Sequence, residues 1–323
     1  MANEKMRPRP HIGRRLAKRI PTALAGLLRF SILTGLIFLI VYPFLFMGIM
    51  AFRSPQDLND SSVVWITRHW SLENVRTFFS LVDVGEMLGY SAVISVGSAL
   101  LQTFMCGFTG YGFARFRFKG RRLLFGLVLF TIIVPPQTYI LQLFLLFRLF
   151  PVPFFGGLLE RLTGSSTLNL INTPAPYLLQ AALGMGLRSG LFIYIYRQFF
   201  RGLPKELESA ASIDGSNALR TYFSVMLPNA RPAMVTTFLL SLAWNWNDAF
   251  SQNFLNMSRD TVAVFLSNIR SSIEASGLRY DDPTELYLVI QTGSLLCIAP
   301  LLLLFLIGQR AFTEGVERTG LVG

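Results

Sequence analysis

The side chains that most often carry out chemistry are few in this chain and have no catalytic spacing. The two histidines, His11 and His69, both lie outside the long apolar segments, and neither belongs to an HExxH motif. The two cysteines, Cys106 and Cys297, each lie inside an apolar stretch and have no metal-site spacing, so we expect ordinary core residues. No GxSxG elbow occurs. The sequence therefore predicts neither an enzyme nor a metal site.

Nucleotide hydrolysis by this chain is also not expected. A phosphate-binding loop of the GxxxxGK[ST] type needs a lysine directly after a glycine. None of the four lysines follows one; they are Lys5, Lys18, Lys119 and Lys205. No cofactor is predicted in this chain.

A few polar residues inside apolar segments are the remaining candidates for chemistry. Asp248 is the one acidic residue expected well within a span, which gives little support to an ion-coupled carrier. Sugars stack on aromatic rings and hydrogen-bond to amides, so we hypothesise a pathway role for the run Trp244, Asn245, Trp246 and Asn247. The alternative for this run is packing and hydrogen bonding between helices.

Arg188 lies in the middle of another apolar segment. Insertion of an arginine at the membrane centre costs about 3 kcal/mol, so its side chain should face a polar interior or reach towards the interface. We hypothesise that Arg188 lines the pathway and meets an acidic sugar.

The elements that must position these residues are membrane helices. The 323 residues are 52% hydrophobic and 15% charged, with a mean hydropathy of +0.48. Soluble domains have about 25% charged residues, so this composition indicates a membrane protein. The net charge of +11 lies in blocks beside apolar runs, where it favours membrane topology and lipid headgroups and not nucleic acid.

Apolar runs predict an all-α, polytopic protein with six transmembrane helices. A basic tail (1–29) precedes a transmembrane domain (30–310), and a short tail (311–323) follows. The predicted spans are 30–52, 87–114, 123–147, 177–196, 233–255 and 286–309. Of the 29 basic residues, twenty lie beside the termini or in the loops after spans two and four, and eight lie on the other side. Both termini and the segment 203–232 are therefore predicted to be cytoplasmic.

Two of these spans carry further signals. Small residues in span two let neighbouring helices approach closely, so it is expected inside the bundle; they are Gly97, Ser98, Gly107, Gly110 and Gly112. Pro135 and Pro136 in span three predict a kink in that helix.

The segment 203–232 is a polar interruption with the pattern of two helices joined at a glycine. Pro204 suits a helix start, and Asp214–Gly215 suits a left-handed stop. Ser216 or Asn217 can cap a second helix, which is expected to end before Leu227–Pro228. The pattern predicts a stiff protrusion, although an interfacial amphipathic loop is the alternative.

This segment resembles the EAA motif of binding-protein-dependent ABC importer permeases. The resemblance lies in Ala210–Ala211, Gly215 and the run Val225 to Pro228. Further elements resemble the carbohydrate branch of that family, and the similarity covers roughly residues 30–320. These elements are the segments 111–115 (YGFAR), 119–121, the Pro135 region, 197–200, 243–245, the loop segment 70–74 (WSLEN) and the C-terminal segment from Gln309 to Gly320.

The resemblance implies a type I ABC importer permease, one half of a membrane pathway that works by alternating access. It implies a second homologous permease, two ATPase subunits that carry ATP and Mg, and an extracytoplasmic solute-binding protein that delivers a carbohydrate. It places the chain as a multi-pass protein of the bacterial inner membrane. ATPase coupling is assigned by the resemblance to Glu206, Leu207, Glu208, Ser209, Ala210, Ala211, Asp214, Gly215, Leu227 and Pro228.

One position departs from the family pattern, and two functional alternatives remain. The family usually has glutamate before the two alanines, whereas this chain has Ser209. Glu206 or Glu208 could supply the charge; otherwise docking would depend on Leu207 with the alanines. The alternatives to a sugar importer are an ABC permease for another solute and a stand-alone channel or secondary carrier.

Overall fold

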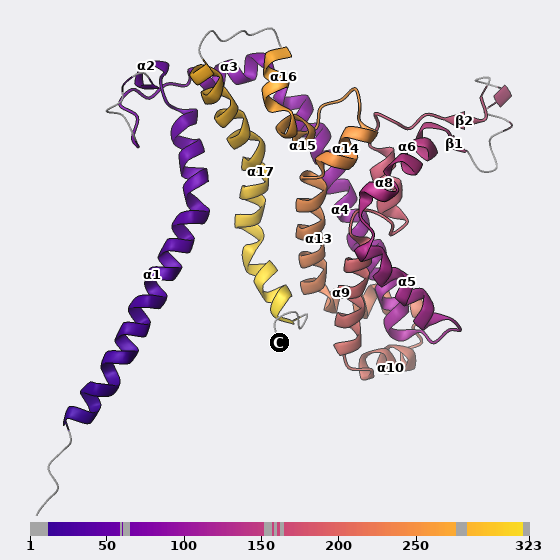
Figure 1. The fold of residues 1–323 in the computed structure, drawn as a ribbon. Coiled ribbons are helices and arrows are strands. Elements are labelled where there is room, and N and C mark those ends of the chain that lie inside the picture. The colour runs from indigo at the N-terminus through magenta and orange to yellow at the C-terminus, as the bar shows by residue number, and fades with distance from the viewer. Residues whose placement is uncertain are drawn as a thin grey trace, which may run out of the picture. The chain divides into compact units, whose positions relative to one another are not determined.

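The computed structural model describes residues 12–58, 60, 65–151, 157, 160, 161, 165–275 and 283–318 (Figure 1). Helices dominate these residues, as predicted, and a two-residue antiparallel pair joins β1 (Phe150–Pro151) to β2 (Thr167–Leu168). His11 and the ends of both predicted tails lie outside the described residues. The chain divides into two units, residues 1–75 with 284–295 and residues 76–283 with 296–323.

The first unit contains α1 (Ile12–Ala51), α2 (Pro55–Leu58) and the start of α3 (Glu73–Leu81). The part of α1 from Leu24 to Ala51 is apolar and long enough to cross a membrane, and its most apolar stretch buries no residue within the structure. A helix that is apolar on all sides is stable only where lipid or another subunit surrounds it. The predicted tail is helical from Ile12 onwards.

A buried carboxylate organises the loop that follows α1. One oxygen of Asp57 accepts hydrogen bonds from the backbone N–H groups of Arg68 (2.7 Å) and His69 (2.8 Å) and from the Thr67 hydroxyl. Its other oxygen lies 2.7 Å from Nδ1 of His69. The backbone N–H of His69, the Thr67 hydroxyl and the His69 ring together lower the pKa of Asp57 well below its ordinary 3.8.

We expect Asp57→Asn to lower the thermal midpoint of the purified protein at neutral pH. An amide accepts these hydrogen bonds poorly and directs its own N–H groups at the donors. Because folding lowers the pKa of Asp57, its stabilisation is present above pH 3.8 and is lost as the pH falls through the lower folded-state pKa. The midpoints of the two proteins, measured in detergent, should therefore converge in acid.

The control is Asp60→Asn, which removes an exposed ion pair to Arg68. Exposed pairs contribute little, so this variant should melt like the native protein. Equal midpoints for all three proteins at neutral pH would show that the Asp57 carboxylate does not support the loop.

The second unit is built around α4 (Val84–Arg115). This helix packs against α8 (Ala175–Ala182), α9 (Ser189–Gly202) and α13 (Arg231–Trp246). Its small residues allow close approach, as predicted: a Cβ on Gly110 would lie 2.5 Å from Cβ of Tyr196 on α9. On Gly112 the nearest atom to such a Cβ is 4.0 Å away, on Phe116. Cys106 and Cys297 are both buried, in agreement with a core role.

Three predicted spans are broken, contrary to the expectation of single helices. Residues 123–147 form α5 (Arg121–Ile133), the 3₁₀ turn η1 (Pro136–Thr138) and α6 (Ile140–Arg148). Pro135 and Pro136 cause this break because neither has a backbone N–H for the helix. Residues 233–255 divide into α13 and α14 (Ala249–Leu255), where Asp248 accepts from the N–H of Ser251 (3.0 Å) and starts a new helix.

The break in residues 177–196 corrects the placement of Arg188. Helix α8 ends before Gly184 (φ +69°), and α9 begins after Arg188, whose own φ is +60°. Arg188 is therefore the residue that starts α9, and not the middle of a continuous helix. Within the described residues, three helical stretches are long and apolar enough to cross a membrane: Leu24–Ala51, Val84–Arg115 and Glu285–Arg310.

The predicted loop 256–285 contains two helices of the second unit, α15 (Val262–Ser267) and α16 (Ile269–Ala275). The last helix, α17 (Pro283–Arg318), is shared: residues 284–295 belong to the first unit and residues 296–318 to the second. Helix α17 continues to Arg318, so part of the predicted C-terminal tail is helical. Between α9 and α13 lie α10 (Glu206–Ile213), α11 (Ala218–Thr221), the π turn η2 (Tyr222–Met226) and α12 (Leu227–Asn229), with α10 at the end of this unit opposite α6 and α14 (Figure 1).

Candidate coupling segment and translocation site

The segment 203–232 has the predicted glycine corner. Gly215 has φ +76°, and its N–H donates to the Ser212 carbonyl (3.1 Å). The N–H of Ser216 donates to the Ala211 carbonyl (2.9 Å). These two bonds form a Schellman motif, which closes α10 and fixes the direction of the chain that follows.

The second helix of the segment is longer than predicted. Asn217 caps it, because its Oδ1 accepts from the N–H of Arg220 (2.8 Å). The helix does not end before Leu227–Pro228; it passes through η2 and continues as α12 to Asn229. Pro228 is tolerated because the π turn shifts the hydrogen-bond register, and Pro228 then lies in the first turn of α12, where its N–H is not needed.

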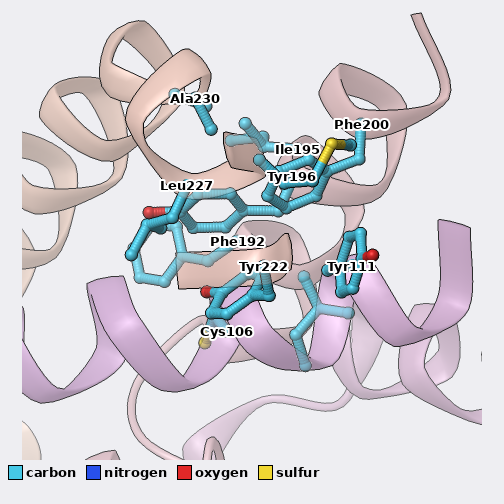
Figure 2. Packing of buried hydrophobic residues seen from close by; sticks show 12 residues of the cluster. Cys106, Tyr111, Phe192, Ile195, Tyr196, Phe200, Tyr222, Leu227 and Ala230 are labelled. Carbon is cyan, nitrogen blue, oxygen red and sulfur yellow. The ribbon is translucent and has the colours of Figure 1, made fainter. Parts of the chain in front are cut away.

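Aromatic rings fasten this second helix to α4 and α9. Tyr222 is 1% exposed, and its ring centroid lies 5.1 Å from that of Tyr111 on α4 and 6.3 Å from that of Phe200 on α9. Figure 2 shows these rings gathered with Tyr196 in one cluster. Met226 is also fully buried in this cluster. The second helix of the segment is therefore packed tightly against the helix bundle.

The predicted coupling residues occupy different environments. Ala211 is buried and Leu207 is half-buried, so of the three expected docking residues only Ala210 is exposed. Glu206, Ser209, Asp214 and Pro228 are also exposed, whereas Leu227 is buried. The Glu208 carboxylate accepts from the Tyr111 hydroxyl (2.8 Å) and pairs with Arg115 (3.3 Å) within this chain.

Sequence reasoning missed the large apolar side chains that this segment exposes. Ile213 is 86% exposed, and Leu219 and Phe223 are more than half exposed. Leu219 and Phe223 form one i,i+4 row, whereas Tyr222 and Met226 form another that faces inward. The i,i+4 spacing of both rows can be read from the sequence, but only the packing of Tyr222 and Met226 against α4 and α9 shows which row is buried.

The predicted pathway residues are not brought together as one site. The Arg188 guanidinium lies 5.6 Å from the Trp244 ring, which stacks on Phe192 at 5.5 Å. Trp246 is buried, and the Asn247 amide donates to the Ala243 carbonyl of its own helix (2.8 Å). The exposed Arg188 thus lies over the half-buried Trp244, while Trp246 and Asn247 make local contacts.

Asn245 belongs to a buried polar network that joins four helices. Its Nδ2 donates to Oε1 of Gln102 on α4 (3.2 Å). Nε2 of Gln102 donates to Ser189 Oγ on α9 (2.9 Å), and Gln252 on α14 donates to the Asn245 carbonyl (2.6 Å). Buried networks of this kind favour one arrangement of the helices.

A small cavity opens beside this network. It lies among α4, α8, α13, α14 and the η1–α6 turn, and its lining includes Ser98, Tyr139, Tyr177, Gln180, Asn245 and Asp248. Within the described part of the chain, the buried Ser98 hydroxyl has no hydrogen-bond partner. Aromatic rings beside amide and carboxylate groups are the chemistry that recognises sugars. Tyr139, Tyr177 and Gln180 were not predicted, because three broken helices bring them together.

Comparison with known proteins identifies the chain. The family model described as "Binding-protein-dependent transport system inner membrane component" matches residues 103–318, which is more than half of the chain. The chain belongs to this family. The match includes the whole of the 203–232 segment and the cavity residues other than Ser98, and it confirms the family resemblance seen in the sequence.

Individual relatives of this permease are also sugar transporters by name. It is 25% identical to the lactose transport system permease protein LacG of Rhizobium radiobacter over 93% of this chain and 97% of the relative. It is 26% identical to the arabinooligosaccharides transport system permease protein AraQ of Halalkalibacterium halodurans, over 88% and 92% of the two chains. The permease is thus a transport component and not an enzyme.

A solved structure supports the fold. The permease superposes on a chain of a bacterial ABC transporter involved in the import of the acidic polysaccharide alginate, with a TM-score of 0.63. The two chains are 17% identical, and the superposition covers 95% of the permease and all of that chain. The fold is therefore that of an ABC importer permease.

Proposed function

We propose that this permease forms half of the translocation pathway of an ATP-driven bacterial importer for a sugar or oligosaccharide. The proposal includes six membrane spans, two cytoplasmic termini and a place in the inner membrane. A second permease, two ATPases that bind ATP and Mg, and an extracytoplasmic binding protein complete the importer. The names of the relatives support the sugar substrate, and the charge distribution supports the topology.

The main support for a coupling role is the tight packing of the 203–232 segment against α4 and α9. Its Schellman corner is stiff, its second helix is packed on α4 and α9, and its outer surface exposes Ile213, Leu219 and Phe223. A rigid segment of this kind transmits a rigid-body movement, whereas a flexible loop would absorb it. Closure of the ATPases would then move α4 and α9 and change which side of the pathway is open.

Reconstitution into proteoliposomes tests the proposal. The complete complex with its binding protein should take up a sugar only when ATP is present, and the permease alone should take up none. Competition with peptides, polyamines and phosphate should leave sugar uptake unchanged. Uptake by the permease alone, or inhibition by one of the non-sugar solutes, would contradict the proposal.

Arg188 and Trp244 provide a test of the pathway. If the exposed Arg188 guanidinium pairs with the carboxylate of an acidic sugar, Arg188→Gln should lower uptake of that sugar about fivefold, equivalent to about 1 kcal/mol for an exposed ion pair. Uptake of a neutral sugar should change little. The measurement is radiolabelled uptake by the complete complex.

Arg148→Gln is the matched control, because Arg148 makes the same kind of contact to Phe144 outside the proposed pathway. It should leave uptake of both sugars near the native level. Unchanged uptake and selectivity in the Arg188 variant would show that Arg188 does not contact the substrate in the pathway.

A further inference from the structure

The YGFAR motif (111–115), at the C-terminal end of α4, contacts the segment 203–232. Tyr111 and Arg115 are four residues apart, so they project from the same face of the helix. The Tyr111 hydroxyl donates to one carboxylate oxygen of Glu208 (2.8 Å), and Nε of Arg115 lies 3.3 Å from the other. Both oxygens of one carboxylate on α10 are therefore held by one turn of α4.

Arg115 also holds the chain just before α10. Its Nη2 donates to the Leu203 carbonyl (2.7 Å). The Arg115 side chain is 8% exposed and that of Glu208 23%, so water screens this pair much less than a surface ion pair. Tyr111 is itself fixed, because its ring packs edge-on against Phe200 at 5.4 Å.

Helix α10 has little else that attaches it to the membrane helices. Ala211 is the one buried residue among its eight, and the helix packs mainly on η2 and α11 of its own segment. An alanine side chain buries too little apolar surface to hold a helix in place. The polar contacts from Tyr111 and Arg115 to Glu208 thus connect α10 directly to α4.

We infer that Tyr111, Arg115 and Glu208 form a clasp that makes α10 and α4 move as one body. Glu208 is then a positioning residue within the permease and not the contact to an ATPase. Among the acidic residues of α10, this leaves the exposed Glu206 to face a partner. The inference rests on the proposed coupling function, but the attachment of α10 can be tested without it.

The attachment is tested by limited trypsin digestion of the full-length chain in detergent. Lys205 is exposed and lies directly before α10. Arg115→Glu should accelerate cleavage after Lys205 severalfold, because it removes the hydrogen bond to the Leu203 carbonyl and the ion pair to Glu208, and the new carboxylate repels Glu208. Arg117→Glu is the matched control: Arg117 is exposed two residues away, and this variant should digest at the native rate.

The coupling role is tested with the complete complex in proteoliposomes. Arg115→Glu and Glu208→Arg should each keep ATP hydrolysis but lower uptake per ATP about tenfold, and the double variant should recover at least half of the native ratio. Arg117→Glu should leave the ratio unchanged. If a charge-reversal variant fails to assemble, Glu208→Gln and Tyr111→Phe, which keep size and packing, should each lower the ratio at least twofold.

The outcomes separate the two claims. Native cleavage rates in the Arg115 variant would overturn the clasp. Accelerated cleavage with a native uptake-to-ATP ratio, or a double variant no better than the worse single one, would overturn its role in coupling. A native complex without ATP-dependent uptake would refute the proposed function, while digestion would still report whether the clasp holds α10.

Discussion

Replacing Gly215 with valine is expected to leave ATP hydrolysis in place but to lower uptake per ATP about tenfold or more. Gly215 has φ +76°, a conformation that costs other residues about 1–2 kcal/mol and β-branched residues more. A Cβ at this position would meet no atom within 4 Å, so the effect comes from the backbone alone. The Schellman corner would open, and α10 would lose its fixed direction.

Three variants control this experiment. Gly215→Asn should keep most coupling, because asparagine tolerates the left-handed region. Gly202→Val places the same side chain in equally open space without a positive φ, so it should have a small effect. Ser209→Ala should also do little, because Ser209 is exposed and its hydroxyl donates back to the Lys205 carbonyl of the preceding turn (3.3 Å). Near-native uptake per ATP in the Gly215→Val complex would refute the role of the corner.

Gly110→Val is expected to prevent recovery of a folded permease. A Cβ at Gly110 would lie 2.5 Å from Cβ of Tyr196 and 3.1 Å from two backbone atoms of α9. Backbone atoms cannot rotate away, so α4 and α9 would have to separate along the whole contact. We expect a loss of about 3 kcal/mol, since overpacking of a tight interface costs this much and membrane helices depend on close approach.

The measurements for Gly110→Val are the monodisperse fraction in size-exclusion chromatography and the thermal midpoint in detergent. Gly112→Val is the matched control, because the nearest atom to its Cβ would be 4.0 Å away, on Phe116, the residue directly after α4. It should behave like the native protein. An equal decrease of the monodisperse fraction and the thermal midpoint in both variants would show that the poor helix propensity of valine, and not the α4–α9 contact, causes the loss.

Local backbone features were predictable because they depend on neighbouring residues. The positive φ of Gly215 and the Asn217 cap follow from side chains within a few positions of the bonds they make. The close packing of α4 was also predictable, since small residues at helical spacing have few other uses in a membrane. The break at Pro135 and Pro136 was predicted as a kink, and its physical cause is the missing N–H.

The breaks in two other spans, the cavity and the length of the second helix were not predicted. The breaks at Arg188 and Asp248 have no proline, and each is stabilised by a cap or a left-handed residue within an apolar run. The cavity residues Tyr139, Tyr177 and Gln180 come from separate helices, so no spacing joins them in the sequence. The length of the second helix depended on a π turn that allows Pro228 within it.

The amino-acid sequence by itself determined that this protein is a helical membrane protein with two helices joined at a glycine corner, because apolar length, charge bias and local capping are encoded in neighbouring residues. The tertiary structure decided which glutamate is held within the chain and which is exposed. Glu206 and Glu208 are two positions apart and chemically identical, but Tyr111 and Arg115 lie some ninety residues earlier and reach only Glu208. An ion pair between such distant positions forms only after α4 and α10 have packed.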